Sequence, residues 1–335
     1  MTGGLMRYRI IAAIMILIML LTSGCVIKKD IKNNTEKGLD IVATIFPAYD
    51  FARAVAGDKA KVHMLIKPGS EVHSYEPAPN DIQLINECDI FIYVGGESDS
   101  WLVNVLETID NPHMQIIRMM DYANNIEEEY VEGMQIRDEH HAHSHQEGAK
   151  HSEDHEEHQH EYDEHVWTSP KNALEIVKAI TDAIINKDTV NKDYYIRTSS
   201  DYQSALLLLD YDFCNAVKDS NRKVLVFGDR FPLLHFVKEY GLEYYAAYPG
   251  CAAESEPNAK TVAFLIEKVK QENIPVVFHM EMSNEKMTDT ICEATGAEKM
   301  LFSSCHNVTA EQFESGVTYI DLMKENLKAL KKALN

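Results

Sequence analysis

Residues 191–217 read NKDYYIRTSSDYQSALLLLDYDFCNAV, and this stretch decides the fold. It contains neither glycine nor proline, the two residues that least favour a helix interior. As one α-helix it would be about 40 Å long, at 1.5 Å per residue. A helix of that length is well suited to bridge two lobes, so we expect residues 191–218 to be a linking helix.

Short apolar, β-branched runs alternate with helical patterns on both sides of this segment, which is typical of parallel sheets covered by helices. We expect strands at 40–46, 61–66, 90–94, 223–227, 243–247, 275–278 and 299–302. We expect the other helices at 49–56, 79–87, 101–107, 172–185, 259–270, 284–295 and 310–332. The prediction is therefore an α/β fold with an N-terminal lobe over 39–190 and a C-terminal lobe over 219–335. Ligands in such folds bind in the crevice at the carboxyl ends of the strands.

Residues 1–24 have the layout of a secretory signal peptide. Arg7 and Arg9 precede an apolar run over residues 10–21. A membrane-spanning helix needs roughly twenty apolar residues, and this run is too short. We therefore expect the chain to be exported across the membrane.

Small residues at 22–24 stand directly before Cys25 and resemble the lipobox of bacterial lipoproteins, in which the cysteine carries lipid after cleavage. We expect a lipidated Cys25 to anchor the chain at the outer face of the cytoplasmic membrane, with the polar residues 25–38 as a flexible tether. Thr22 departs from the pattern, which usually has leucine there. A cleaved signal with an incidental Cys25 is the alternative.

The net charge of −21 limits the classes of partner. It argues against nucleic acid, whose phosphates would repel the chain, and it suits a protein that attracts cations. The five cysteines after Cys25 include no CxxC pair, so they do not form a disulfide scaffold. Export still makes one disulfide plausible.

Nine of the fifteen histidines lie between residues 140 and 165, interleaved with Asp and Glu. Residues 137–164 have too few apolar side chains to offset their ordering entropy and are predicted to be a disordered loop. Imidazoles suit zinc, copper and nickel, so we expect the loop to collect or sense zinc. Its histidines are His140, His141, His143, His145, His151, His155, His158 and His160. The alternative is an acidic, solvated loop that binds metals only incidentally.

His73 stands alone in a different setting. Residues 67–77 are rich in turn formers, follow a predicted strand and lead into the helix expected from residue 79. A histidine at the carboxyl end of such a strand points into the crevice. On spacing alone, His73 is either a metal ligand or an ordinary loop histidine.

Two motifs resemble those of a known family. Residues 69–82, GSEVHSYEPAPNDI, resemble the first metal-ligand motif of the cluster A-I solute-binding proteins, the zinc and manganese receptors of ABC importers. Residues 163–170, DEHVWTSP, resemble the second, which follows a histidine-rich loop. Residues 240–242 and 318–327 also match, so the likeness runs in order over nearly all of the mature chain. It implies two lobes joined by a rigid helix, metal bound between them, and transfer to a membrane permease.

The resemblance implies that His73 and His165 are metal ligands. The family usually has a third histidine just after the first strand of the second lobe, where residues 227–232 here read FGDRFP. Asp229 is the candidate ligand at that place. The alternative is that Arg230 holds Asp229 in a structural pair.

The family's fourth ligand, commonly an aspartate, follows the last strand of the second lobe, where residues 303–307 read SSCHN. His306 is the best candidate there, and its alternative role is to cap the turn before the last helix. His279 and Glu281 end another strand facing the crevice and are further candidates. His235, expected one turn into a helix, is expected to be packed or exposed.

Cys251 and Cys305 both fall in loops after strands of the second lobe. We expect them to form a disulfide that fixes the loop of His306. A thiolate is also a strong zinc ligand, so Cys305 as a ligand is the alternative in a reducing setting.

These patterns together predict a receptor that delivers Zn²⁺ to the permease of an ABC importer, not an enzyme, and expected to be a monomer. A manganese or iron receptor of the same family is the nearest alternative, disfavoured by the many nitrogen donors. A zinc-dependent hydrolase is the alternative from another class. It would need an open coordination position, a substrate pocket and a base such as Glu281, around which no hydrolase motif stands.

Overall fold

The computed structural model describes residues 38–135, 162–250 and 258–335. Several predictions concern residues outside these ranges: the signal peptide, the lipidation of Cys25, the tether up to residue 37, the eight loop histidines and Cys251. Within the described ranges, no helix combines the length and the apolar character that crossing a membrane requires.

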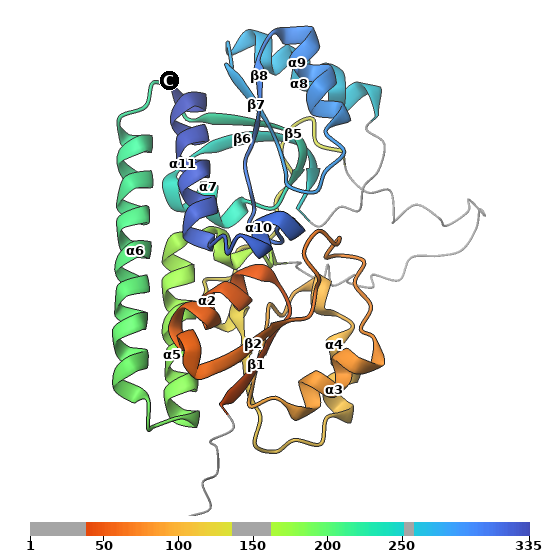
Figure 1. Ribbon diagram of the computed structural model, residues 1–335. Helices are drawn as coiled ribbons and strands as arrows, with labels where there is room; N and C mark the ends of the chain where they lie inside the picture. Colours follow the sequence, from red (N-terminus) through yellow and green to blue (C-terminus); the bar gives the residue numbers. More distant parts are fainter. Residues whose placement is uncertain (1–37, 136–161, 251–257) are drawn as a thin grey trace, which may run out of the picture. The chain divides into compact units, whose positions relative to one another are not determined.

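The first lobe is built on a sheet of four parallel strands in the order β2-β1-β3-β4 (Figure 1). The strands are β1 (Leu39–Ala43), β2 (Ala60–Met64), β3 (Ile90–Tyr93) and β4 (Gln115–Arg118). Sequence analysis predicted the first three and missed β4. Its four residues, QIIR, are too short a run for periodicity to separate a strand from a loop.

The second lobe repeats this topology with the order β6-β5-β7-β8, again all parallel. Its strands are β5 (Val224–Phe231), β6 (Glu243–Pro249), β7 (Val276–His279) and β8 (Glu298–Leu301). In both sheets the strand order reverses between the first and third strands, the place where α/β sheets bind ligands. Strand β5 extends beyond its predicted end, with a register shift between Phe227 and Arg230. Asp229 therefore lies within β5 and not in a loop after it.

Helix α6 (Lys192–Lys218) is the predicted linking helix, and the prediction of two α/β lobes joined by it is confirmed. It packs against helices of both lobes, α2 and α5 of the first and α7 and α11 of the second (Figure 1). The helices of the first lobe are α2 (Phe46–Ala56), α3 (Pro79–Glu87), α4 (Leu102–Thr108) and α5 (Pro170–Lys187). Those of the second are α7 (Leu234–Tyr240), α8 (Ala259–Gln271), α9 (Lys286–Thr295), α10 (Ala310–Glu314) and α11 (Tyr319–Leu334).

The prediction of one continuous helix from residue 310 was wrong, because α10 and α11 are separate helices. Gly316 adopts a φ of +77°, which ends the helical path. Thr318 then caps α11: its side chain accepts a hydrogen bond from the backbone N–H of Asp321, and the Asp321 carboxylate accepts one from the backbone N–H of Thr318. The apolar spacing continues across the break, and this concealed it.

A buried carboxylate connects the two lobes and the linking helix. Asp50 of α2 is fully buried, and its Oδ2 accepts hydrogen bonds from the backbone N–H of Tyr319 at the start of α11 (2.8 Å) and from the hydroxyl of Tyr202 on α6 (2.9 Å). Its Oδ1 accepts one from Nε of Arg53 at 2.7 Å. One side chain thus serves three donors from three helices.

We expect Asp50→Ala to lower the free energy of unfolding by about 3–5 kcal/mol, since it leaves buried donors and the Arg53 charge without their acceptor. Urea unfolding of the metal-free protein measures this loss. Asp201→Ala, on the exposed face of α6, is the matched control and should change stability by no more than about 0.5 kcal/mol. Equal losses in the two variants would contradict the role given to Asp50.

Candidate metal centre

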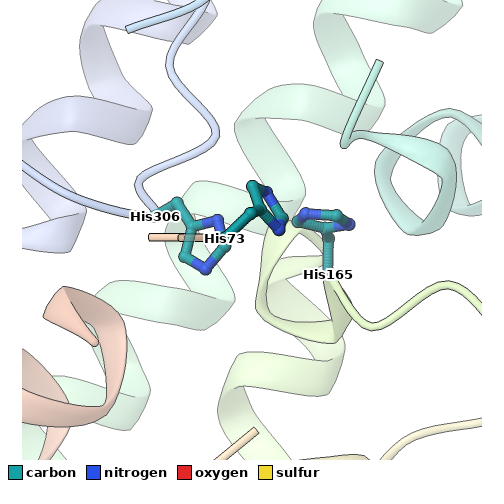
Figure 2. A group of neighbouring side chains, drawn as sticks. All are labelled: His73, His165 and His306. Carbon is teal, nitrogen blue, oxygen red and sulfur yellow. The ribbon is translucent and has the colours of Figure 1, made fainter. Parts of the chain in front are cut away.

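Three histidines from separate segments meet between the lobes (Figure 2). His73 lies in the loop between β2 and α3, His165 directly precedes the short 3₁₀ helix Val166–Thr168, and His306 lies between β8 and α10. Each offers a ring nitrogen, and these atoms lie within 4.8 Å of one another. The centroid of the His306 ring lies 5.3 Å from that of the His73 ring and 5.4 Å from that of the His165 ring. The structure therefore brings together three of the four predicted ligands.

Both ring nitrogens of His165 and one of His306 are buried without a hydrogen-bond partner. His165 is fully buried, and neither of its ring nitrogens makes a hydrogen bond. The Nε2 atom of His306 is likewise buried and without a partner. Buried polar atoms normally find hydrogen bonds, because leaving them unpaired costs free energy. Three converging imidazole nitrogens match the donors that zinc prefers.

Asp163 and Trp167 place His165. The carboxylate Oδ1 of Asp163 accepts a hydrogen bond from the backbone N–H of His165 at 2.8 Å and lies 3.3 Å from Nδ1 of its ring, outside hydrogen-bond geometry. The indole of Trp167 packs 5.4 Å from the His165 ring and 4.8 Å from the His306 ring. Its Nε1 donates to the carbonyl of Ser304 at 2.7 Å. Trp167 thus joins the segment of His165 to the loop of His306.

Glu281 holds the loop of His306. Its Oε2 accepts a hydrogen bond from the backbone N–H of Ser304 at 2.8 Å, and its Oε1 accepts from that of His306 at 3.1 Å and from the Ser304 hydroxyl. Both carboxylate oxygens are therefore engaged by the loop. The structure gives Glu281 a supporting position and leaves it outside the group of converging ligand atoms.

Hydrogen bonds also tie the loop of His306 to that of His73. The Nδ2 atom of Asn307 donates to the carbonyls of Lys67 (2.9 Å) and Ser70 (2.8 Å). The backbone N–H of Gly69 donates to the carbonyl of Val308 at 2.7 Å. The two histidine-bearing loops, one from each lobe, are consequently fixed to each other.

The surroundings move the pKa values of two of these imidazoles in opposite directions. Burial acts to lower the pKa of His165, but the carboxylates of Asp163, Glu164 and Glu128 together outweigh it, so the pKa is raised. Burial lowers the pKa of His306 well below its usual value, and the neighbouring His73 and His165 lower it further. His306 is therefore neutral at physiological pH, with a lone pair available, while His165 retains its proton more readily.

Asp229, the fourth predicted ligand, is held away from the three histidines. Its Oδ1 accepts a hydrogen bond from the backbone N–H of Arg230 at 2.8 Å, and its Oδ2 accepts from that of Met280 at 3.0 Å. The Arg230 guanidinium lies 3.4 Å from Glu71 instead of pairing with Asp229. In the described part of the chain, Asp229 is not among the ligand atoms that converge.

The two other candidate histidines are also engaged elsewhere. His235 is 2% exposed, with Nδ1 3.2 Å from the amide of Asn172 and Nε2 3.1 Å from the carbonyl of Asp163, so it is packed, as expected. His279 directs Nδ1 towards the carbonyl of Met280 at 3.2 Å. Neither belongs to the converging group in the described ranges.

Cys305 is a buried thiol in the structure, with a positive φ of 61°. Burial raises the pKa of this thiol well above its usual value, which does not favour the thiolate that binds zinc. Its expected disulfide partner, Cys251, lies outside the described residues, so the disulfide stays a prediction.

Sequence analysis missed the supporting residues. Asp163 stands two positions before His165, and this was the available signal for a carboxylate beside that ring. Glu281 carried no signal for its role, because its partners Ser304 and His306 are more than twenty residues away along the chain.

Comparison with known proteins identifies the family. The family model described as "Zinc-uptake complex component A periplasmic" (ZnuA) matches residues 41–333. The chain belongs to this family. The zinc-binding lipoprotein AdcA of Streptococcus pneumoniae is 28% identical over 298 residues, which cover 88% of this chain and 55% of AdcA. The chain thus spans about half the length of that relative. The high-affinity zinc uptake system protein ZnuA of Bacillus subtilis is 30% identical over 299 residues, 88% of each chain.

Solved structures show the same fold. The Zn(II)-bound ZnuA-like domain of Streptococcus pneumoniae AdcA superposes with a TM-score of 0.70 at 26% identity, covering 89% of this chain and 99% of that domain. The metal-dependent lipoprotein YcdH of Bacillus subtilis gives a TM-score of 0.70 at 28% identity, covering 89% of this chain and all of that one. The two-lobed architecture with its linking helix is therefore that of the ZnuA family.

We expect Glu281→Ala to destabilise the metal-free protein by about 1–3 kcal/mol, because the loop N–H groups of Ser304 and His306 lose their acceptor. Chemical denaturation measures the effect. Glu293→Ala, on an exposed position of α9, serves as control and should lie within about 0.5 kcal/mol of the unaltered protein. If Glu281→Ala is as stable as the control, Glu281 does not hold the loop.

Proposed function

We propose that this chain is an extracytoplasmic receptor that binds Zn²⁺ and delivers it to an ABC importer. The observation that carries the proposal is the convergence of three imidazoles at one point between the lobes. The ring nitrogens of His165 and Nε2 of His306 are, in addition, buried and without a hydrogen-bond partner. Membership of the ZnuA family and the likeness to a Zn(II)-bound domain support the choice of metal. In this proposal His73, His165 and His306 are the ligands.

Tetrahedral zinc takes four donors, so one more is needed. We propose Asp229 for this position, as the sequence suggests. Asp229 would reach the metal only by giving up its hydrogen bonds with the backbone of Arg230 and Met280. Its contribution to affinity should therefore be smaller than that of any of the three histidines.

Delivery requires a membrane partner. The family description names a component of a zinc-uptake complex, and this supports an ABC permease as the acceptor of the metal. A lipidated Cys25 would hold the receptor at the outer face of the cytoplasmic membrane, as a monomer near that permease. The histidines over residues 140–160 would collect zinc and pass it to the crevice.

The donor set disfavours the two alternatives. Manganese and iron receptors would be served better by oxygen donors than by three imidazoles. A zinc hydrolase needs a free general base, and both oxygens of Glu281 accept hydrogen bonds from the loop of His306. The site is better suited to holding an ion than to activating water for an attack.

The decisive experiment is zinc titration of the full-length chain in mild detergent, in competition with a chromophoric chelator. We expect one tight site that is lost in His73→Ala, His165→Ala and His306→Ala, and weakened less in Asp229→Ala. His113→Ala, an exposed histidine of the same lobe as His73, is the control and should bind as the unaltered chain does. Tight binding that survives all three crevice substitutions would refute the proposed site.

Deletion of residues 140–160 separates the loop from the crevice. One tight zinc should remain after this deletion, while the number of weakly bound ions falls, because eight imidazoles interleaved with carboxylates offer many interchangeable sites. Stoichiometry from metal analysis after dialysis reports both numbers. If deletion of residues 140–160 removes the tight site, that site lies in the loop and not in the crevice.

Zinc affinity should fall as pH decreases, because histidines bind metal only in their neutral form. The raised pKa of His165 means that the fall begins above pH 6.5, the ordinary histidine value, and proceeds by about tenfold per pH unit from this residue alone. His306, with its lowered pKa, adds nothing in this range. In Asp163→Asn the fall should start at lower pH, since the largest of the charges that raise the pKa of His165 is gone. Competition titrations from pH 8 to 5.5 measure the zinc affinity of the unaltered chain and of Asp163→Asn. An affinity that does not change with pH would contradict the assignment of His165 as a ligand.

A further inference from the structure

We propose that Glu164 is a positioning residue of the metal centre: it fixes the imidazole of His73 so that the ring presents its other nitrogen to the metal. This inference rests on the proposed function. It assigns a role to a buried carboxylate that sequence analysis did not single out and that does not itself belong to the converging ligand atoms.

The first support is geometric. Glu164 is 1% exposed, and its Oε1 lies 3.8 Å from Nδ1 of His73, a residue from a different segment of the chain. This is ion-pair distance and exceeds that of a hydrogen bond. We propose that it shortens to a hydrogen bond when His73 binds the ion, as a ligating histidine commonly donates its second N–H to a carboxylate.

The second support is that a backbone hydrogen bond fixes the Glu164 carboxylate. The Oε2 atom of Glu164 accepts a hydrogen bond from the backbone N–H of Ser98 at 3.0 Å. This bond belongs to the turn that follows β3, in the first lobe. One oxygen is thus anchored to the lobe while the other faces His73.

The third support is Gly96, in the same turn. A Cβ atom added there would lie 2.0 Å from Oε2 and 2.2 Å from Cβ of Glu164. Its φ of −98° is accessible to any residue, so the backbone conformation does not require glycine. Glycine is required at position 96 because the Glu164 side chain occupies the space that a Cβ atom would need.

The need for such a support follows from the setting of His73. Its loop has no helix or strand of its own between β2 and α3, and the His73 side chain is 14% exposed, whereas His165 is fully enclosed. Packing alone therefore restrains the His73 ring less than it restrains the ring of His165. A fixed carboxylate sets the ring orientation and also makes the imidazole a better donor to the metal.

The test uses the full-length chain with Zn²⁺ and, as a spectroscopic probe, Co²⁺. Glu164→Gln removes the charge, and Gly96→Ala displaces the side chain without altering any charge. Each should weaken zinc binding by about 10- to 100-fold and change the Co²⁺ visible absorption. Asp99→Asn is the matched control: Asp99 is 5% exposed in the same turn, and its carboxylate accepts hydrogen bonds from the backbone of Val94 and Gly95. It should bind within about twofold of the unaltered chain.

The outcomes are distinct. If the unaltered chain has no tight zinc site, the proposed function itself fails. If it binds zinc tightly and both Glu164→Gln and Gly96→Ala bind equally well with an unchanged Co²⁺ spectrum, the role of Glu164 is refuted. Thermal unfolding of the metal-free variants distinguishes loss of fold from loss of affinity. If one of the two variants is unfolded, its binding data are not used. The zinc affinity and Co²⁺ spectrum of the other variant then test the role of Glu164.

Discussion

Three imidazoles are held with their ring nitrogens within 4.8 Å of one another, and the arrangement of the rest of the structure can be understood from that constraint. The histidines come from segments far apart in sequence, and both ring nitrogens of His165 and Nε2 of His306 have no hydrogen-bond partner in the protein. Burial of unpaired nitrogens opposes folding. The surrounding contacts must supply the free energy that keeps the rings together, and they do so through the Trp167 indole, the Glu281 carboxylate and the Asn307 amide.

The same constraint explains the linking helix and the polar network near it. A site shared by two lobes keeps its geometry only if the lobes keep theirs. Helix α6 packs against both lobes, and Asp50 joins α2 to α6 and α11 through buried hydrogen bonds. A helix that packs against both lobes in this way disfavours a wide rotation of one lobe against the other.

Much of the fold could be predicted from local patterns. Strand and helix periodicities, and the uninterrupted stretch that became α6, depend on neighbouring residues and so can be read along the chain. The errors also have local causes. Strand β4 was too short to carry a period, and the break between α10 and α11 was hidden because the apolar spacing continues across Gly316. Strand β5 continues to Phe231 because pairing with β6 stabilises residues that have no strand pattern of their own.

The sequence by itself determined the two α/β lobes, the linking helix, the family and His73, His165 and His306 as candidate ligands, because each of these leaves a periodic or motif signal within a short window. Only the tertiary structure decided that the three histidines converge, that Asp229 is bound by the backbone of Arg230 and Met280, and that Glu281 supports a loop. Those facts depend on which loops of two sheets face one another. That pairing is set by long-range packing, and no window of the sequence encodes it.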